Sequence, residues 1–326
     1  KGQLLDNLTK RWLRYQEKPD EFWTDYPGMP FDISGLDSIQ IRKKSYQKFV
    51  KDFIRCGAAI DDNIEKILAT LKESGQLENT IVVITSDHGM PFPRAKASLY
   101  DAGAHVPLAI RWPKGIVNSG RTYTGLVNLS DLAPTFLEAS GVAVPKMMTA
   151  SSLLSVLENK SKKQRDRVFI AMERHDGCRK GGKGYPSRAI RTADYLYIQN
   201  IEPNRWPAGN PDREFCARYI PFGEVDSSPT KSLLMDNKER PEFKQFYDLA
   251  FAKRPAEELY NVNEDPGQLI NLSTKPKYAT IRKKLAQQLK DHLIRTKDPR
   301  ALGLDAPWDY YPYYGLKRNK NWQVDP

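Results

Sequence analysis

Four consecutive β-branched residues, Ile81 to Ile84, constrain the fold of this 326-residue chain more than any other stretch. A continuous apolar run of this kind is typical of a strand buried on both faces of a parallel sheet. A second apolar run, Val106 to Pro113, follows it. Helical spacing of apolar residues precedes the first run, from Ser38 to Ser74, and follows the second, from Asn128 to Val142. This alternation of helices and strands predicts an α/β fold with a mixed sheet flanked by helices.

The pattern changes near residue 165. Residues 168–174, 188–201 and 258–262 have the composition of short strands, and Lys277 to Thr296 has the spacing of an amphipathic helix. We therefore expect residues 1–165 to be part of an α/β domain and residues 166–326 to form a smaller subdomain, in which one helix covers an antiparallel sheet.

Composition narrows the class of partner. The formal net charge is +11 and the sequence pI is about 9.3, so the surface is expected to attract polyanions. Nucleic acid, an anionic membrane and a sulfated or phosphorylated substrate all fit this charge, as does an ordinary solvated basic surface. The sequence contains none of the common nucleic-acid-binding patterns and no apolar run long enough to span a bilayer, so we expect neither nucleic-acid binding nor a membrane span.

The three cysteines, Cys56, Cys178 and Cys216, are widely separated. Their spacing argues against a structural zinc site and against a disulfide framework, and we expect them to be plain thiols.

Charged residues follow the first apolar run directly. Ligands of open α/β sheets bind beyond the carboxyl ends of the strands, where Asp87 and His88 are expected to lie. A carboxylate beside an imidazole can bind a divalent cation, and Lys96 can hold an anion next to it. The alternative is a surface loop in which Asp87 caps a turn and His88 packs.

The segment from Asn79 to Pro113, which contains "NTIVVITSDHG" and "VPLAIRWP", resembles a characteristic block of the sulfatase family, within the alkaline-phosphatase-like superfamily. Residues 58–80 and 126–142 resemble the helices on either side of that block, and residues 185–200 and 258–273 resemble the family's C-terminal subdomain. Within the family, "MPFPRAKASLY" is most similar to the heparan N-sulfatase (N-sulfoglucosamine sulfohydrolase) branch, which includes bacterial members. The resemblance covers the C-terminal portion of such a protein and implies its fold.

The resemblance also implies a site. Asp87 and His88 correspond to ligands of Ca²⁺, and Lys96 corresponds to the catalytic basic residue that contacts the substrate sulfate. The family's nucleophile is a formylglycine made from Cys or Ser in a C/S-x-P-S-R motif, and none of the three cysteines begins such a motif. "GYPSR", residues 184–188, ends like the motif but has glycine in the nucleophile position, so we interpret it as the start of a strand. We therefore expect the nucleophile in a missing N-terminal portion of the same protein, and this chain alone to be inactive.

Three further residues are candidates for substrate binding. Arg174 and His175 stand in a glycine-rich basic loop that could reach the rim of the site, and Arg205 precedes Trp206, a ring that could stack on a sugar. An ordinary exposed loop and simple packing are the respective alternatives.

Together these features predict a Ca²⁺-dependent hydrolase of sulfuric ester or sulfamate bonds in a sulfated oligosaccharide or glycosaminoglycan. A phosphoesterase of the same superfamily and a non-catalytic chain that binds sulfated polysaccharide are the alternatives. The resemblance implies an extracytoplasmic location, which is periplasmic or secreted in a bacterium and lysosomal in an animal.

Overall fold

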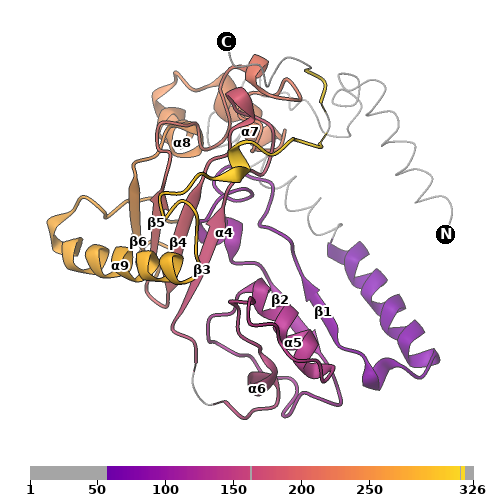
Figure 1. Ribbon diagram of the computed structural model, residues 1–326. Helices are drawn as coiled ribbons and strands as arrows, with labels where there is room; N and C mark the ends of the chain where they lie inside the picture. Colours follow the sequence, from indigo (N-terminus) through magenta and orange to yellow (C-terminus); the bar gives the residue numbers. More distant parts are fainter. Residues whose placement is uncertain (1–56, 162–163, 316, 320–326) are drawn as a thin grey trace, which may run out of the picture.

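The computed structural model describes residues 57–161, 164–315 and 317–319 (Figure 1). Of the helix predicted between Ser38 and Ser74, the part before residue 57 lies outside the described residues. Residues 57–73 are helical, and the helix ends at Gly75, whose φ of +70° suits glycine. Among the described residues, no helix combines the length and the apolar character needed to cross a bilayer.

After the helix of residues 57–73, the first part of the chain has a two-stranded sheet and short helices. Its elements are η1 (Leu77–Asn79), β1 (Val82–Thr85), α4 (Asp101–Ala104), β2 (Leu108–Arg111), η2 (Leu129–Asp131), α5 (Leu132–Ala139) and α6 (Leu154–Leu157). Both predicted strands and the helix between Asn128 and Val142 are therefore present.

The predicted direction of the strands is wrong for the described residues. β1 and β2 pair antiparallel, with Val83 opposite Ile110, and they form a sheet of two strands. β1 is not buried on both faces either, because the Ile84 side chain is 40% exposed. An apolar run indicates that a strand packs against other residues. The direction of that strand relative to its neighbour depends on the path of the intervening chain, which here returns through a loop and the short helix α4.

The second part of the chain forms a four-stranded antiparallel sheet in the order β3-β4-β5-β6, which confirms the predicted sheet type. Its elements are β3 (Arg167–Met172), η3 (Lys180–Gly182), β4 (Ser187–Thr192), β5 (Tyr195–Asn200), η4 (Arg213–Phe215), α7 (Pro229–Asp236), α8 (Pro241–Phe251), β6 (Glu257–Asn261), η5 (Pro276–Tyr278), α9 (Ala279–Arg295) and η6 (Pro307–Asp309). The "GYPSR" segment leads into β4, as the sequence predicted.

Helix α9 covers one face of this sheet (Figure 1). Leu285, Leu289 and Leu293 recur at every fourth position and are buried against Ile190 and Leu259. Side chains alternate between the two faces of a strand, so the neighbours of these sheet residues point away from α9.

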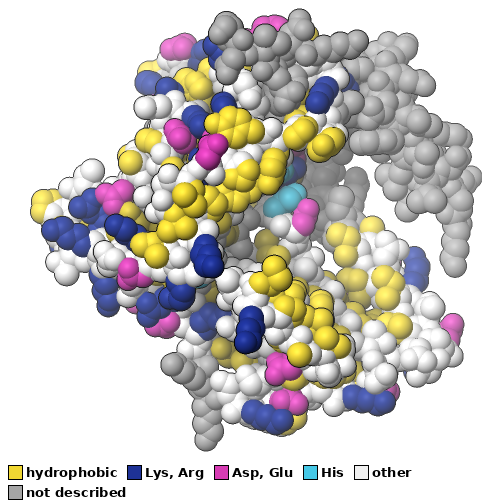
Figure 2. Space-filling model, in the orientation of Figure 1, with side chains coloured by type: hydrophobic (Ala, Val, Ile, Leu, Met, Phe, Trp, Pro, Cys, Tyr) yellow, Lys and Arg dark blue, Asp and Glu magenta, His cyan; other side chains and the backbone are white. Residues whose placement is uncertain are grey.

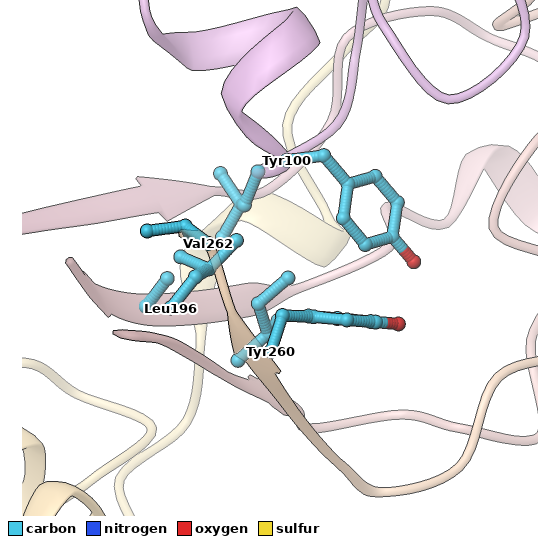
Figure 3. Close-up of a cluster of buried hydrophobic side chains, with 7 residues drawn as sticks. Tyr100, Leu196, Tyr260 and Val262 are labelled. Carbon is cyan, nitrogen blue, oxygen red and sulfur yellow. The ribbon is translucent and has the colours of Figure 1, made fainter. Parts of the chain in front are cut away.

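The opposite face is covered by a segment that comes well before β3 in the sequence, because Tyr100 belongs to the same buried cluster as Ala189 on β4. Leu99 and Tyr100 pack there against Leu196, Tyr260 and Val262 (Figure 3). The chain just after Lys96 is therefore held on the C-terminal sheet.

A third cluster, which the sequence did not predict, lies beyond the ends of the strands, around helices α7 and α8. Phe222 stacks on Phe251 there, with ring centroids 4.6 Å apart, and Phe243 and Leu234 complete the buried set. This cluster supports the loop of residues 222–226, which reaches the candidate site.

Candidate functional site

The Asp87–His88 turn begins two residues after β1 and is tightly held. The Ser86 hydroxyl donates to the His88 carbonyl oxygen at 2.7 Å, and the Gly89 amide donates to the Gly103 carbonyl oxygen at 2.9 Å. A Cβ atom at Gly89 would overlap the carbonyl oxygen of Ala102, so only glycine allows this close approach to α4.

Asp87 and His88 present two facing groups. The Nδ1 atom of His88 lies 2.7 Å from the Gly89 carbonyl oxygen, which only accepts, so Nδ1 carries the proton of that hydrogen bond. Nε2 then lies 3.4 Å from Oδ2 of Asp87, whose side chain is 84% exposed. An unprotonated Nε2 and a carboxylate at this distance offer two electron-pair donors that could bind one cation. A metal-binding histidine commonly donates its other nitrogen to a backbone carbonyl in this way.

The backbone of Lys96 is hydrogen-bonded to the segment that follows this turn, but its side chain makes an ion pair with a residue far away in the chain. Its amide donates to the Met90 carbonyl oxygen at 3.0 Å, which closes the intervening loop. Its ammonium group lies 2.9 Å from Oδ2 of Asp226, a partner that the sequence did not predict. The charge of Lys96 is therefore balanced by a carboxylate from the loop of residues 222–226.

His175 follows β3 and is the candidate with the most structured surroundings. Its Nδ1 atom lies 2.6 Å from Oε2 of Glu224, and the other carboxylate oxygen of Glu224 accepts from Arg179 at 2.7 Å. The side chains of Glu224 and Arg179 are each 2% exposed, whereas His175 is 35% exposed. Burial raises the pKa of Glu224, but Arg179 and His175 outweigh it, and the net pKa lies below the usual range. Glu224 is thus an anion at neutral pH.

The two histidines meet at one cavity. The rings of His88 and His175 are 6.5 Å apart between centroids and nearly perpendicular. Asp87, His88, Arg174 and His175 all line a cavity of about 1930 Å³, whereas Lys96 and Arg205 lie outside its lining. Figure 2 shows histidine and acidic side chains inside the hollow between the two parts of the molecule.

The two candidate arginines make structural contacts. Arg174 donates to the carbonyl oxygens of Gly182 and Pro312, each at 3.1 Å. Arg205 makes two hydrogen bonds to the carboxylate of Asp309, at 3.0 and 3.1 Å, so its guanidinium is already paired. The roles predicted for the candidate residues remain predictions.

Sequence reasoning missed Arg179, Glu224 and Asp226. Glu224 is 49 residues from His175 and 45 from Arg179, and its segment matches no motif. No spacing pattern in the sequence indicates this grouping, which depends on how the loop of residues 222–226 folds back over the His175 loop.

The donor set fits a cation in part. Ca²⁺ takes six to eight oxygen ligands, and the exposed carboxylate of Asp87 suits it, with His88 beside it. Among the described residues, no group of three or more His, Cys, Asp or Glu side chains is placed to hold a metal ion. Asp87 and His88 would therefore be two ligands of a larger set. Cys178 and Cys216 are buried free thiols, as predicted, while Cys56 lies outside the described residues.

Comparison with known proteins finds two family matches that overlap in this chain. Residues 14–142 match the family described as Sulfatase, and residues 90–207 match the one described as N-sulphoglucosamine sulphohydrolase, C-terminal. The human N-sulphoglucosamine sulphohydrolase is 28% identical over 252 residues, which cover 74% of this chain and 46% of that protein. An ulvan-active sulfatase of Formosa agariphila is 28% identical over 235 residues, which cover 71% of this chain and 35% of that protein.

A solved structure extends the likeness to three dimensions. A protein in complex with its substrate, D-glucosamine-2-N,6-O-disulfate, superposes with a TM-score of 0.54 at 26% identity, covering 78% of this chain and 42% of that one. The chain spans about a third to a half of the length of these relatives. Over that span both its sequence and its fold resemble those of sulfatases, and the resemblance to the N-sulphoglucosamine sulphohydrolases is particular.

Proposed function

We propose that this chain is part of a Ca²⁺-dependent sulfatase that hydrolyses sulfuric ester or sulfamate bonds of a sulfated glycan. The observation that carries the proposal is the meeting of Asp87, His88 and His175 at one cavity, although β1 and the His175 loop come from different parts of the chain. The relatives named above act on sulfated glucosamine or on ulvan, which supports a glycan as the substrate class.

Each residue has a role in this proposal. Asp87 and His88 would hold the cation, which would stabilise negative charge on the sulfuryl oxygens. The ammonium of Lys96 would exchange Asp226 for a sulfate oxygen when substrate enters, because both partners offer the same type of anionic acceptor. Arg174 and His175 would contact the sugar at the rim of the cavity.

The nucleophile of the proposed reaction would be a formylglycine outside these 326 residues. The remaining metal ligands would also come from outside them. An extracytoplasmic location belongs to the same proposal. A phosphoesterase and a non-catalytic polysaccharide binder are the competing functions, and the ion pair of Lys96 does not distinguish a sulfate from a phosphate.

The test uses the complete protein and D-glucosamine-2-N,6-O-disulfate, with and without a calcium chelator. Asp87→Ala is expected to lower kcat/KM by at least about a hundredfold, because it removes a charged ligand that stabilises the transition state. Asp61→Ala is the matched control: it removes a carboxylate from the exposed face of helix 57–73 and should leave the rate unchanged.

The competing functions give different results. A polysaccharide binder would hold heparin without turnover, tolerate the chelator and release the ligand uniformly as salt rises. A phosphoesterase would turn over a phosphate monoester faster than the sulfate. Full activity of Asp87→Ala or of Lys96→Ala would contradict the assigned site.

A further inference from the structure

We infer that Arg179 and Glu224 form a buried positioning pair, which fixes His175 in one tautomer and presents its Nε2 atom to the cavity as a contact for the substrate's sugar ring. This inference rests on the proposed function and deepens it, because it assigns a specificity-determining atom and the two residues that orient it.

The Glu224 carboxylate fixes the tautomer of the His175 ring. Glu224 is ionised and almost fully buried, so its oxygens only accept hydrogen bonds. At 2.6 Å from Oε2, the Nδ1 atom of His175 must donate. Nε2 is then the unprotonated atom of the neutral ring. Because Nδ1 points at a buried group, the edge that carries Nε2 is the edge turned toward the cavity that His175 lines.

Arg179 holds Glu224 from the other side. Its Nη1 atom donates to Oε1 of Glu224, and its Nε and Nη2 atoms donate to the carbonyl oxygens of Trp206 and Pro207, all at 2.7 Å. A planar guanidinium with three fixed partners has little freedom to rotate. It also supplies the charge without which a buried carboxylate would be protonated or excluded.

The backbone locks the same loops together. The Glu224 amide donates to the Ala208 carbonyl oxygen at 3.1 Å, and the Asn210 amide donates to the Cys178 carbonyl oxygen at 2.8 Å. Gly223 lies so close to Cys178 that an added Cβ would be 2.7 Å from the cysteine Cβ. Glu224 is therefore held by its own amide and by the close packing of Gly223 before it. Its carboxylate stays in place and does not move with the His175 ring.

The consequence is a directional contact. A neutral Nε2 accepts a hydrogen bond, and sugar hydroxyl and amino groups are donors, so His175 would recognise the ring that carries the sulfate group. A sulfate ester without such donors, such as 4-nitrophenyl sulfate, would gain nothing from it. Arg179 and Glu224 act only through His175 and are positioning residues.

The first experiment needs no catalytic activity. In protein labelled with ¹⁵N-histidine, at about pH 8.5, where an ordinary imidazole is neutral, the ring nitrogen shifts report the tautomer. His175→Gln assigns the signals by difference among the four histidines of the chain. We expect His175 to be entirely the Nδ1–H tautomer. A mixture, or the Nε2–H tautomer, would overturn the inference even if no Glu224 variant folds.

The second experiment is a double-mutant cycle in the complete protein with D-glucosamine-2-N,6-O-disulfate. Glu224→Gln is expected to lower kcat/KM by about ten- to a hundredfold, the usual effect of losing the partner that orients a functional side chain. His175→Ala, which removes the contact itself, should cause a loss of similar size. In the His175→Ala background, Glu224→Gln should add less than about a twofold loss. The same variants should lose less activity with 4-nitrophenyl sulfate than with the disulfated sugar, because that ester offers no sugar donor to Nε2.

Glu257→Gln is the matched control. Glu257 also pairs with an arginine, Arg282, but it lies on β6 outside the cavity lining and should not change the rate. An undiminished Glu224→Gln effect without His175 would show a structural role and contradict the inference. Absence of all sulfate hydrolysis, with the expected tautomer still observed, would contradict the proposed function alone.

Discussion

The charged side chain of Lys231 is buried. Its side chain is 4% exposed, and its ammonium donates to the carbonyl oxygens of Phe222 and Val225, at 2.9 and 2.8 Å. It thus ties the start of α7 to the loop that carries Glu224. Burial lowers the pKa of Lys231 from 10.5 to about 8, because desolvation disfavours the ammonium form.

This shift predicts a pH dependence of stability. Between about pH 8 and 10.5 the unfolded lysine keeps its proton while the folded one has lost it, so the unfolded state binds more protons and the free energy of unfolding rises with pH. The gain is at most about 3.5 kcal/mol, since the shift is about two and a half pKa units and each unit corresponds to about 1.4 kcal/mol.

Urea titrations of the protein and of Lys231→Met at several pH values test it. The buried thiol of Cys178, whose pKa burial raises, works in the opposite direction, so the informative quantity is the difference between the two proteins. That difference should shift in favour of the unsubstituted protein as pH rises. Parallel stability curves would contradict the prediction.

At the residue scale, the sequence identified the residues with distinctive neighbours. Asp87 and His88 follow an apolar strand directly, and His175 stands among glycines and basic residues, so each had a local signal. Glu224 and Asp226 have none, because their importance depends on contacts with residues far away in the chain.

At the scale of elements, periodicity predicted what packs on a single face. Helix α9 was evident because its buried leucines repeat every four residues. Helices α7 and α8 were not, since each begins with a proline, Pro229 and Pro241, that is also typical of a turn. The antiparallel pairing of β1 and β2 was missed because an apolar run does not encode the direction of its neighbour.

Helix α9 supplies a prediction of its own. Leu289 is 1% exposed and lies against the sheet, so Leu289→Ala should lower the free energy of unfolding by about 2–5 kcal/mol, through lost burial and the cavity left behind. Lys290→Ala, one position along on the exposed side of the same helix, should change it by less than about 0.5 kcal/mol. Denaturant unfolding followed by circular dichroism measures both, and equal losses would show that α9 does not pack as described.

At the scale of the whole molecule, a local density of basic residues overstates the free charge of that stretch. Basic residues are dense between residues 160 and 191. Four of them, Arg165, Arg179, Arg188 and Arg191, are each paired with a carboxylate. Arg188, which is 2% exposed, bonds to both Glu173 and Asp298. These four guanidinium groups therefore belong to ion pairs within the folded chain, and the excess positive charge that is expected to attract polyanions comes from other basic residues.

The predicted boundary between residues 165 and 166 is crossed by the core around Tyr100. Produced alone, residues 166–326 would expose Leu196, Tyr260 and Val262, whose cover comes from Leu99 and Tyr100. We expect this piece to aggregate or to bind a hydrophobic dye, and coexpression with residues 1–165 to restore a soluble complex. A soluble, cooperatively unfolding 166–326 fragment would contradict the prediction.

The packing of Tyr100 on the C-terminal sheet has a consequence for the engineering of specificity in such proteins. Its hydroxyl bonds at 2.6 Å to the buried carboxylate of Glu258, which also accepts from Tyr260. A chimaera that exchanges only the C-terminal half between two relatives would break this contact and, four residues away, disturb Lys96. Exchanges that carry residues 94–100 together with the sheet beneath them transplant a complete unit, and recombination libraries should place their crossovers accordingly.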